Sequence, residues 1–286
     1  MRHHIPPRPP AEAPVTTAHP NFSQAVASSS GLRRALRNAG INCLDPVVDD
    51  ETPARRPVVH IKYLDGSAAA LLAALLRAGS NPGSETALPT PLVLESMASE
   101  QTVAVRNDLQ SVLADAGISG LTQVEPHPRT GIPVMHLKHL EGSAVATLVS
   151  LLRAGMRDHF ATADALHAAF RAHGLNAGSH FPVPVVRQLR ICLGEISVHT
   201  ALALGSLLGA APFPTELTEV PDYPESQLVM DRLYEAVKTT TSGFMDVQLH
   251  PNCMKCGHSP TISLGAFKLN MAKRLVEALR SADEQS

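Results

Sequence analysis

The amino-acid sequence predicts an α+β fold built from tandem repeats of a small helix–strand–strand–helix unit. Segments of the chain repeat one another, and each repeat passes from a helical to an alternating apolar pattern and back. Glycines also stand where the helices should end. A unit with only two strands is marginally stable alone. We therefore expect the units to pair into antiparallel sheets with the helices packed on one face.

The repeat is clearest in residues 58–79 and 134–155. The first segment begins Val-Val-His-Ile-Lys-Tyr-Leu-Asp-Gly-Ser-Ala and the second Val-Met-His-Leu-Lys-His-Leu-Glu-Gly-Ser-Ala, and both end in Leu-Leu-Arg-Ala-Gly. Aligned without gaps, about 14 of the 22 positions are identical. A third copy keeps the apolar frame and loses the His-Lys pair, and a fourth is fainter.

Composition shifts and proline-rich stretches mark the boundaries between these copies. We expect a disordered Pro/Ala/Ser-rich tail at 1–30, unit 1 at 31–79 and a linker at 80–104. Unit 2 follows at 105–155 and a degenerate unit 3 at 156–211. A proline-rich acidic linker at 212–227 then leads to a degenerate unit 4 at 228–282, which carries a Cys/His hairpin.

Local signals place the helix ends of each unit. Left-handed residues just beyond a helix are usually glycine, and the candidates are Gly40, Gly117 and Gly174 for the opening helices and Gly79 and Gly155 for the closing ones. Serine is a favoured N-cap, and the candidates for the closing helices are Ser67, Ser143 and Ser197.

Successive side chains of a strand point to opposite faces of a sheet, so the second strand of each unit should have one core side and one opposite side. We expect the core side to take Val59, Ile61 and Tyr63 in the first copy and Met135, Leu137 and His139 in the second. The opposite side then forms a candidate binding face of His60, Lys62, His136, Lys138 and Arg190. Cations on a sheet can contact phosphates. Sheet-based RNA readers also stack bases on aromatic side chains, which this expected face lacks. The alternative is a solvated strand surface with no partner.

The hairpin of the fourth copy contains the candidate metal ligands His250, Cys253, Cys256 and His258. A Cys-x-x-Cys pair followed by glycine can wrap a tetrahedral Zn²⁺. A second ligand pair is missing, and four ligands within nine residues would be crowded. The expected cofactor is therefore none or a structural zinc. Free thiols without a special role are the alternative, and a redox site is the least favoured because the pair precedes a strand rather than opening a helix.

Composition excludes some classes of function. The net charge is −2, so the chain lacks the basic footprint of a typical nucleic-acid-binding protein. The longest apolar run, near 198–213, is too short to span a bilayer, and the first residues lack the apolar core of a secretory signal. We therefore expect no membrane association and a cytoplasmic location. The common hydrolase, metalloprotease and nucleotide-binding motifs are missing, so no catalytic residue is named.

Three hypotheses of function follow from these observations. The first is a non-catalytic tandem-repeat binding or scaffold protein, because arrays of small units commonly build extended contact surfaces for a protein or nucleic-acid partner. The alternative is a nucleic-acid-binding protein that uses the basic strand faces. The second alternative is a zinc-dependent enzyme or zinc-stabilised domain centred on the Cys-x-x-Cys pair.

Overall fold

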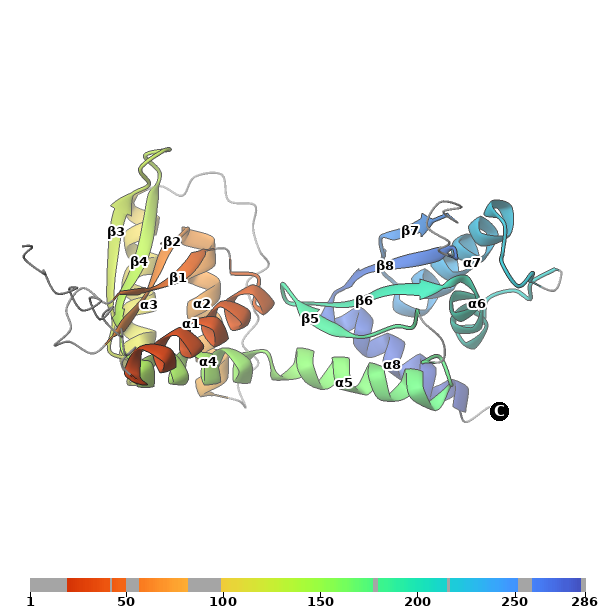
Figure 1. The fold of residues 1–286 in the computed structure, drawn as a ribbon, viewed down its shortest axis with the longest axis horizontal. Coiled ribbons are helices and arrows are strands. Elements are labelled where there is room, and N and C mark those ends of the chain that lie inside the picture. The colour runs from red at the N-terminus through yellow and green to blue at the C-terminus, as the bar shows by residue number, and fades with distance from the viewer. Residues whose placement is uncertain are drawn as a thin grey trace, which may run out of the picture.

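The computed structural model describes residues 20–41, 43–49, 57–81, 99–176, 180–214, 217–251 and 259–283. Across these ranges the order helix–strand–strand–helix occurs four times. Consecutive pairs of units form two halves, each with a four-stranded antiparallel sheet (Figure 1). The α+β fold class is confirmed.

The first half contains four helices and the sheet β1-β2-β4-β3, which we call the first sheet. Its central strands β2 and β4 come from different units and pair antiparallel, so the two hairpins meet along their second strands. The elements are α1 (Pro20–Asn38), β1 (Leu44–Asp49), β2 (Val58–Leu64), α2 (Gly66–Ser80), α3 (Ser99–Asp115), β3 (Leu121–Pro126), β4 (Pro133–Leu140) and α4 (Gly142–Gly155).

The second half repeats this arrangement in the second sheet, whose order is β5-β6-β8-β7. Its central strands β6 and β8 again come from different units. The elements are α5 (Arg157–Ala172), β5 (Val185–Arg187), β6 (Arg190–Ser197), α6 (Val198–Leu207), α7 (Tyr223–Thr241), β7 (Val247–His250), β8 (Thr261–Phe267) and α8 (Leu269–Asp283).

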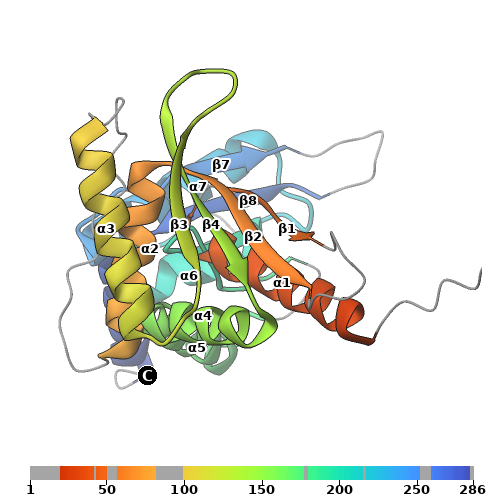
Figure 2. The ribbon, with the colours of Figure 1, turned by 90° about the vertical axis from the view of Figure 1, so that its left-hand side faces the viewer.

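Each half has its own hydrophobic core between its sheet and its helices. In the first half, α1 to α4 lie on the same side of the sheet, and its other face is turned away from them (Figure 2). Fully buried Val59 and Ile61 of β2 and Met135 and Leu137 of β4 point to the helices. The expected packing of helices on one face is therefore confirmed.

The left-handed glycines after the opening helices are confirmed. Gly40, Gly117 and Gly174 have φ of +72°, +67° and +68°. In each case the N–H of the following residue donates to a carbonyl of the last turn, as from Ile41 to Leu36 at 2.9 Å. These bonds satisfy helix-end carbonyls that would otherwise have no intrahelical partner.

The glycines of the closing helices have a different role from the expected one. Gly79 lies inside α2 and Gly155 is the last residue of α4, and neither has a positive φ. They allow α2 and α4 to cross at close range. A Cβ at Gly79 would collide with the carbonyl oxygen of Leu151, and one at Gly155 with the carbonyl oxygen of Leu75. The repeated Leu-x-x-x-Gly spacing is therefore a helix-packing motif related by a local two-fold.

The N-cap prediction was right for one closing helix and wrong for two. Ser197 caps α6, and its hydroxyl accepts from the N–H of Thr200 at 3.0 Å. α2 instead begins after Asp65, whose carboxylate accepts from the N–H of Ala68 at 2.7 Å. Glu141 occupies the same place before α4 without a side-chain bond. The carboxylate of Asp65 reaches the free N–H groups of the first turn because it lies one residue before the helix.

Three helix boundaries also differ from the sequence-based ones, and one of them is α7, which begins at Tyr223, inside the expected linker at 212–227. α1 begins at Pro20, so residues 20–30 of the expected disordered tail are helical, with Ala25 and Ser29 buried. α3 begins at Ser99, inside the expected linker. Residues 1–19 and 82–98 lie outside the described residues. None of the described helices is long and apolar enough to cross a membrane.

The two halves meet where α4 runs into α5. Only Met156 separates these helices, and Phe160 packs against both cores. The turn between β5 and β6 also reaches the first half, because the N–H of Leu189 donates to the carbonyl of Asn38 at 3.0 Å. The junction therefore combines a covalent helix connection with a separate contact near the end of α1.

Candidate binding face of the first sheet

Two β-bulges distinguish the centre of the first sheet. The pairing of β2 with β4 shifts register on both sides of the Ile61–Leu137 pair, so each strand has one extra residue. Tyr63 in β2 and His139 in β4 have left-handed backbones, with φ of +60° and +61°. This conformation costs about 1 kcal/mol or more for a residue other than glycine, and such strain is common at functional sites.

The bulges overturn part of the expected alternation. Leu64 and Leu140, fully buried, take the core positions that simple alternation gives to Tyr63 and His139. The rings of Tyr63 and His139 instead contact His136 and His60 on the opposite side of the sheet. The sequence carries a trace of this change, because apolar residues stand at 59, 61 and 64 rather than at 59, 61 and 63.

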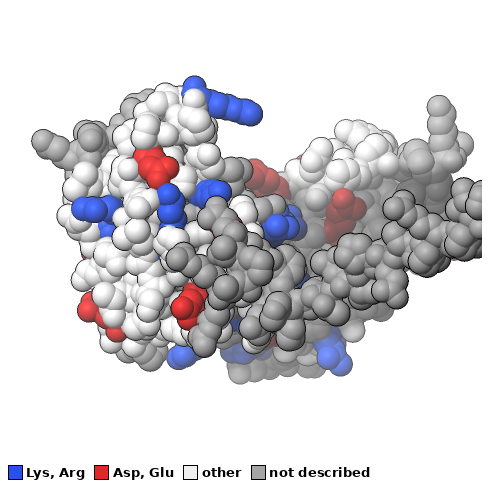
Figure 3. All heavy atoms as spheres, turned by 60° about the vertical axis from the view of Figure 1, so that its left-hand side comes forward, with Lys and Arg blue, Asp and Glu red and all other residues white. Residues whose placement is uncertain are grey.

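We call this open side of the first sheet the histidine face. Figure 3 views it with basic and acidic side chains intermixed among uncharged ones. Four imidazoles and one phenol lie on or beside its central strands, and carboxylates extend from the outer strands. Its members are Asp49, His60, Lys62, Tyr63, Gln123, Glu125, His127, His136, Lys138 and His139.

His60 is held from both sides of its ring. The backbone N–H of His139 donates to Nδ1 at 3.2 Å. The proton of the neutral ring therefore sits on Nε2, which lies 3.4 Å from a carboxylate oxygen of Asp49 on β1. The side chain is 8% exposed, and the ring of His139 packs edge-on against it with the centroids 5.3 Å apart. Both nitrogens have a neighbour, so His60 orients the face rather than acting as a free base.

His136 occupies the equivalent place in the second unit. Its Nε2 lies 3.8 Å from Glu125 on β3, as His60 faces Asp49 on β1. The ring of Tyr63 contacts it edge-on at 5.1 Å and also contacts His127 at 5.0 Å. Its Nδ1 is buried and has no hydrogen-bond partner among the described residues. The two units thus build the same histidine–carboxylate pair, and the second leaves one acceptor unused.

The two lysines of the face have different surroundings. Lys138 donates to Gln123 and Glu125, both at 2.7 Å. Lys62, on the central strand β2, makes no ion pair with any described residue, and its side chain is half-buried. It lies close enough to His60, His136 and Glu125 to influence all three. The centre of the face therefore carries a cation that is in no direct ion pair with a described carboxylate.

Electrostatics keeps the two buried imidazoles neutral near pH 7. Burial lowers the pKa of His60, and the nearby cations lower it further against the opposing effect of Asp49. Burial likewise lowers the pKa of His136, with Glu125 opposing. The hydrogen bond from Lys138 lowers the pKa of Glu125, which stays ionised. At neutral pH, two lysines and two carboxylates therefore nearly balance on this face.

Apolar side chains flank the charged centre. Val47 stands opposite His60 on β1, and Leu121 stands opposite Lys138 on β3, so both share the histidine face. They are 42% and 46% exposed, as is Ile132 at 44% in the β3–β4 hairpin. The face is therefore amphipathic, with apolar contacts on its outer strands and polar groups between them.

Both edges of the first sheet are partly blocked. On β1, Pro46 has no N–H, and its carbonyl accepts from the hydroxyl of Ser29 at 3.1 Å. On β3, the Gln110 side chain of α3 accepts from the N–H of Thr122 at 3.1 Å and donates to the carbonyl of Gly120 at 3.2 Å. A partner strand would have to displace these groups, so the open face is the more accessible surface.

Arg190 does not join the other four predicted residues. It begins β6 in the second sheet, opposite Arg187, and it is exposed next to the turn that touches α1. The structure therefore brings together His60, Lys62, His136 and Lys138, and it places Arg190 at the junction between the halves. Sequence alternation could not show which sheet each strand would join.

Of the four predicted metal ligands, only His250 lies in the described part of the chain. Cys253, Cys256 and His258 lie outside the described residues. His250 ends β7, with Nε2 3.8 Å from Glu195 of β6, which lies on the other side of β8 in the second sheet. The residues that the structure describes contain no grouping of three His, Cys, Asp or Glu side chains that could hold a metal ion.

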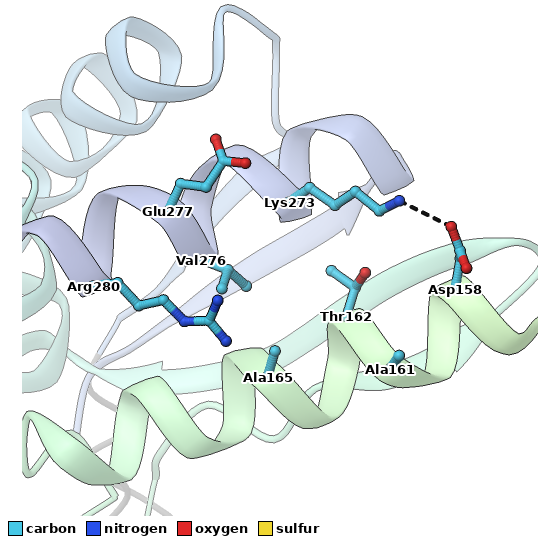
Figure 4. Close-up of a pocket in the computed structure, with 8 residues that line it drawn as sticks. All are labelled: Asp158, Ala161, Thr162, Ala165, Lys273, Val276, Glu277 and Arg280. Carbon is cyan, nitrogen blue, oxygen red and sulfur yellow. Dashed lines mark hydrogen bonds and ion pairs between the residues drawn. The ribbon is translucent and has the colours of Figure 1, made fainter.

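A shallow groove of about 290 Å³ lies between α5 and α8 in the second half. Figure 4 shows Ala161, Ala165 and Thr162 on α5 facing Val276 on α8, with charged side chains around them. Lys273 bonds to Asp158 at 2.9 Å across the groove. Both signs of charge are present, and the described residues show no buried unpaired group that points to a ligand here.

Comparison with known proteins adds no assignment. No protein-family model matches the chain, and neither the curated proteins nor the solved structures contain a significant match.

Proposed function

We propose that this chain is a non-catalytic binding protein that contacts a partner protein through the histidine face. The observation that carries the proposal is the pair of bulges at Tyr63 and His139. Two non-glycine residues are held in an unfavourable backbone conformation, and both turn their rings onto the same open surface. Strain retained at equivalent positions of two units suggests a role for the rings beyond folding.

The composition of the face favours a protein partner. Tyrosine is enriched at protein interfaces, and aliphatic side chains such as Val47 and Leu121 add exposed apolar area. The carboxylates of Asp49 and Glu125 would repel a phosphate backbone laid across the same surface. The cationic groups are also few compared with those of proteins that follow a nucleic-acid strand.

Nucleic-acid binding remains the second candidate because of one observation. The sequence suggested that this face has no aromatic side chain, but the bulge at Tyr63 puts one there beside the imidazoles of His127 and His136. Tyrosine and histidine rings both stack on bases in single-stranded RNA readers. Binding of this kind would weaken steeply with salt.

The test compares the wild-type chain with a face variant and a matched control. The face variant is Tyr63→Ala with His139→Ala, and the control is Lys273→Ala on α8. Each is used as bait in nuclease-treated lysate of the source organism, with circular dichroism to check folding. We expect the same proteins to be recovered by wild type and control and to be lost with the face variant. Equal recovery by all three baits would exclude the histidine face as the contact surface.

A further inference from the structure

The histidine face also indicates what kind of partner segment it fits. Both sheet edges are partly blocked, so a partner must lie on the face itself. A helix with one apolar stripe is the element that packs on a sheet, as α1 to α4 do on the other side. Such a helix would complete a third layer over β2 and β4.

The width of the first sheet sets the length of the partner helix that can cross it. The outer strands β1 and β3 are three strand spacings apart, which is about 14 Å. A helix crossing the sheet from Val47 to Leu121 therefore needs about ten residues, or three turns. Its apolar residues would contact these two side chains, one at each end of the crossing.

The charged side chains of the histidine face indicate which kind of partner side chain lies between those two apolar contacts. Lys62 stands on a central strand without an ion pair to any described residue, whereas Lys138 is already bound by Glu125. Partial burial of Lys62 strengthens the attraction between this lysine and an anion, because water screens the pair less than in bulk. A single carboxylate beside Lys62 would form the direct ion pair that Lys62 lacks among the described residues, and repulsion from the flanking Asp49 and Glu125 disfavours more negative charge than that.

Resting on the proposed function, we propose that the partner presents a short amphipathic helix and that one of its Asp or Glu side chains docks beside Lys62. Its apolar residues pack on Val47 and Leu121, and the rings of Tyr63 and His139 enclose the ion pair. The occupant is thus an acidic, amphipathic protein helix.

The experiment selects binders without knowing the natural partner. A displayed library of random peptides of about 16 residues, long enough to span the sheet as a helix, is selected on the full chain. Enriched peptides are synthesised, and their affinities are measured for wild type, Lys62→Gln, Lys62→Glu and the control Lys273→Glu. Lys62→Gln keeps much of the side-chain length, so a folded variant is available if Lys62→Glu fails to fold.

We expect peptides that combine apolar residues at helical spacing with Asp or Glu. Lys62→Gln should weaken them about tenfold, whereas Lys273→Glu should leave them unchanged.

The other outcomes separate the two proposals. Peptides that need Tyr63 and His139 but have no acidic enrichment, or that ignore Lys62, would refute the acidic helix and leave the binding face intact. Selected peptides that bind equally well to the Tyr63→Ala, His139→Ala variant would refute both proposals, as would failure to select any peptide. A parallel titration with oligo(dT) and oligo(U) covers the nucleic-acid case. Lys62-dependent, salt-sensitive binding of either would replace the protein partner.

Discussion

The two halves of the molecule share a topology and differ at their centres. In the first half, α2 and α4 cross closely through Gly79 and Gly155, whereas α6 and α8 of the second half barely meet. The central strands differ as well. β2 and β4 are bulged at Tyr63 and His139, but β6 and β8 pair without a register shift. The two halves therefore share the order of their helices and strands, while the contacts that shape the surface of each half differ between them.

The largest expected effect comes from disturbing the close crossing of α2 and α4. It tests whether the stability of the first half depends on that crossing. Gly79→Ala or Gly155→Ala drives a methyl group into a backbone carbonyl, which cannot move away as a side chain could. We expect a loss of about 2–4 kcal/mol in the free energy of unfolding, measured by urea denaturation. The control is Gly31→Ala in α1, where a Cβ meets nothing within 4 Å. It should be stabilising by about 0.5–1 kcal/mol. Similar values for both would contradict the close crossing.

The two histidine–carboxylate pairs allow units 1 and 2 to be compared by the stability that each histidine contributes. His60→Leu leaves the partly buried N–H of His139 without its acceptor, whereas Nδ1 of His136 has no partner to lose among the described residues. We expect His60→Leu to cost about 1–2 kcal/mol more stability than His136→Leu, measured by thermal and urea unfolding. An equal or reversed order would show that the bond to His60 contributes little.

The left-handed residues provide a matched pair of substitutions across the two halves. Gly194 in β6 has φ of +78° and open space around its Cβ position, so Gly194→Ala should cost about 1 kcal/mol through backbone strain alone. His139→Gly removes similar strain from the first half and should be neutral or stabilising by up to about 1 kcal/mol. It should nevertheless weaken partner binding, because the ring is lost. A His139→Gly variant that is strongly destabilised would mean that the ring serves the fold.

The smallest expected effect is a pH dependence of folding stability, to which buried histidines of the first half and of the junction between the halves contribute. Burial lowers the pKa of His60, His136 and His159 below the value in an unfolded chain. The unfolded state then binds protons more readily, so stability falls as the pH drops below about 6.5 and levels off once the folded-state pKa values are passed. The change should be visible in urea midpoints between about pH 7.5 and 5.5 and be reduced in a His60→Gln, His159→Gln variant. A midpoint that rises on acidification would reverse the assigned sign.

Much of the fold follows from local sequence signals. The glycines at 40, 117 and 174 and the apolar alternation in β2 and β4 indicated the unit, and the marginal stability of a lone hairpin predicted the pairing. The predictions for Gly79 and Gly155 were wrong for the same reason. Gly79 and Gly155 resemble helix stops in sequence, and only the neighbouring helix shows that they are contact points.

The candidate site was predictable in part. His60, Lys62, His136 and Lys138 were assigned to the open face, and the structure puts them there. Tyr63 and His139 were assigned to the core because simple alternation was assumed, and the shift of the apolar position from 63 to 64 that marks the bulge was not used. Asp49, Gln123 and Glu125 were missed, since pairing across strands decides which carboxylate meets which ring.

The sequence by itself determined the α+β class, the repeated helix–strand–strand–helix order and the polar character of one strand face, because these depend on periodicity and local backbone preference. Only the tertiary structure decided that β2 meets β4, that the bulges turn Tyr63 and His139 outward and that Arg190 belongs to the other half. These features depend on contacts between residues far apart in the chain, which no local pattern encodes.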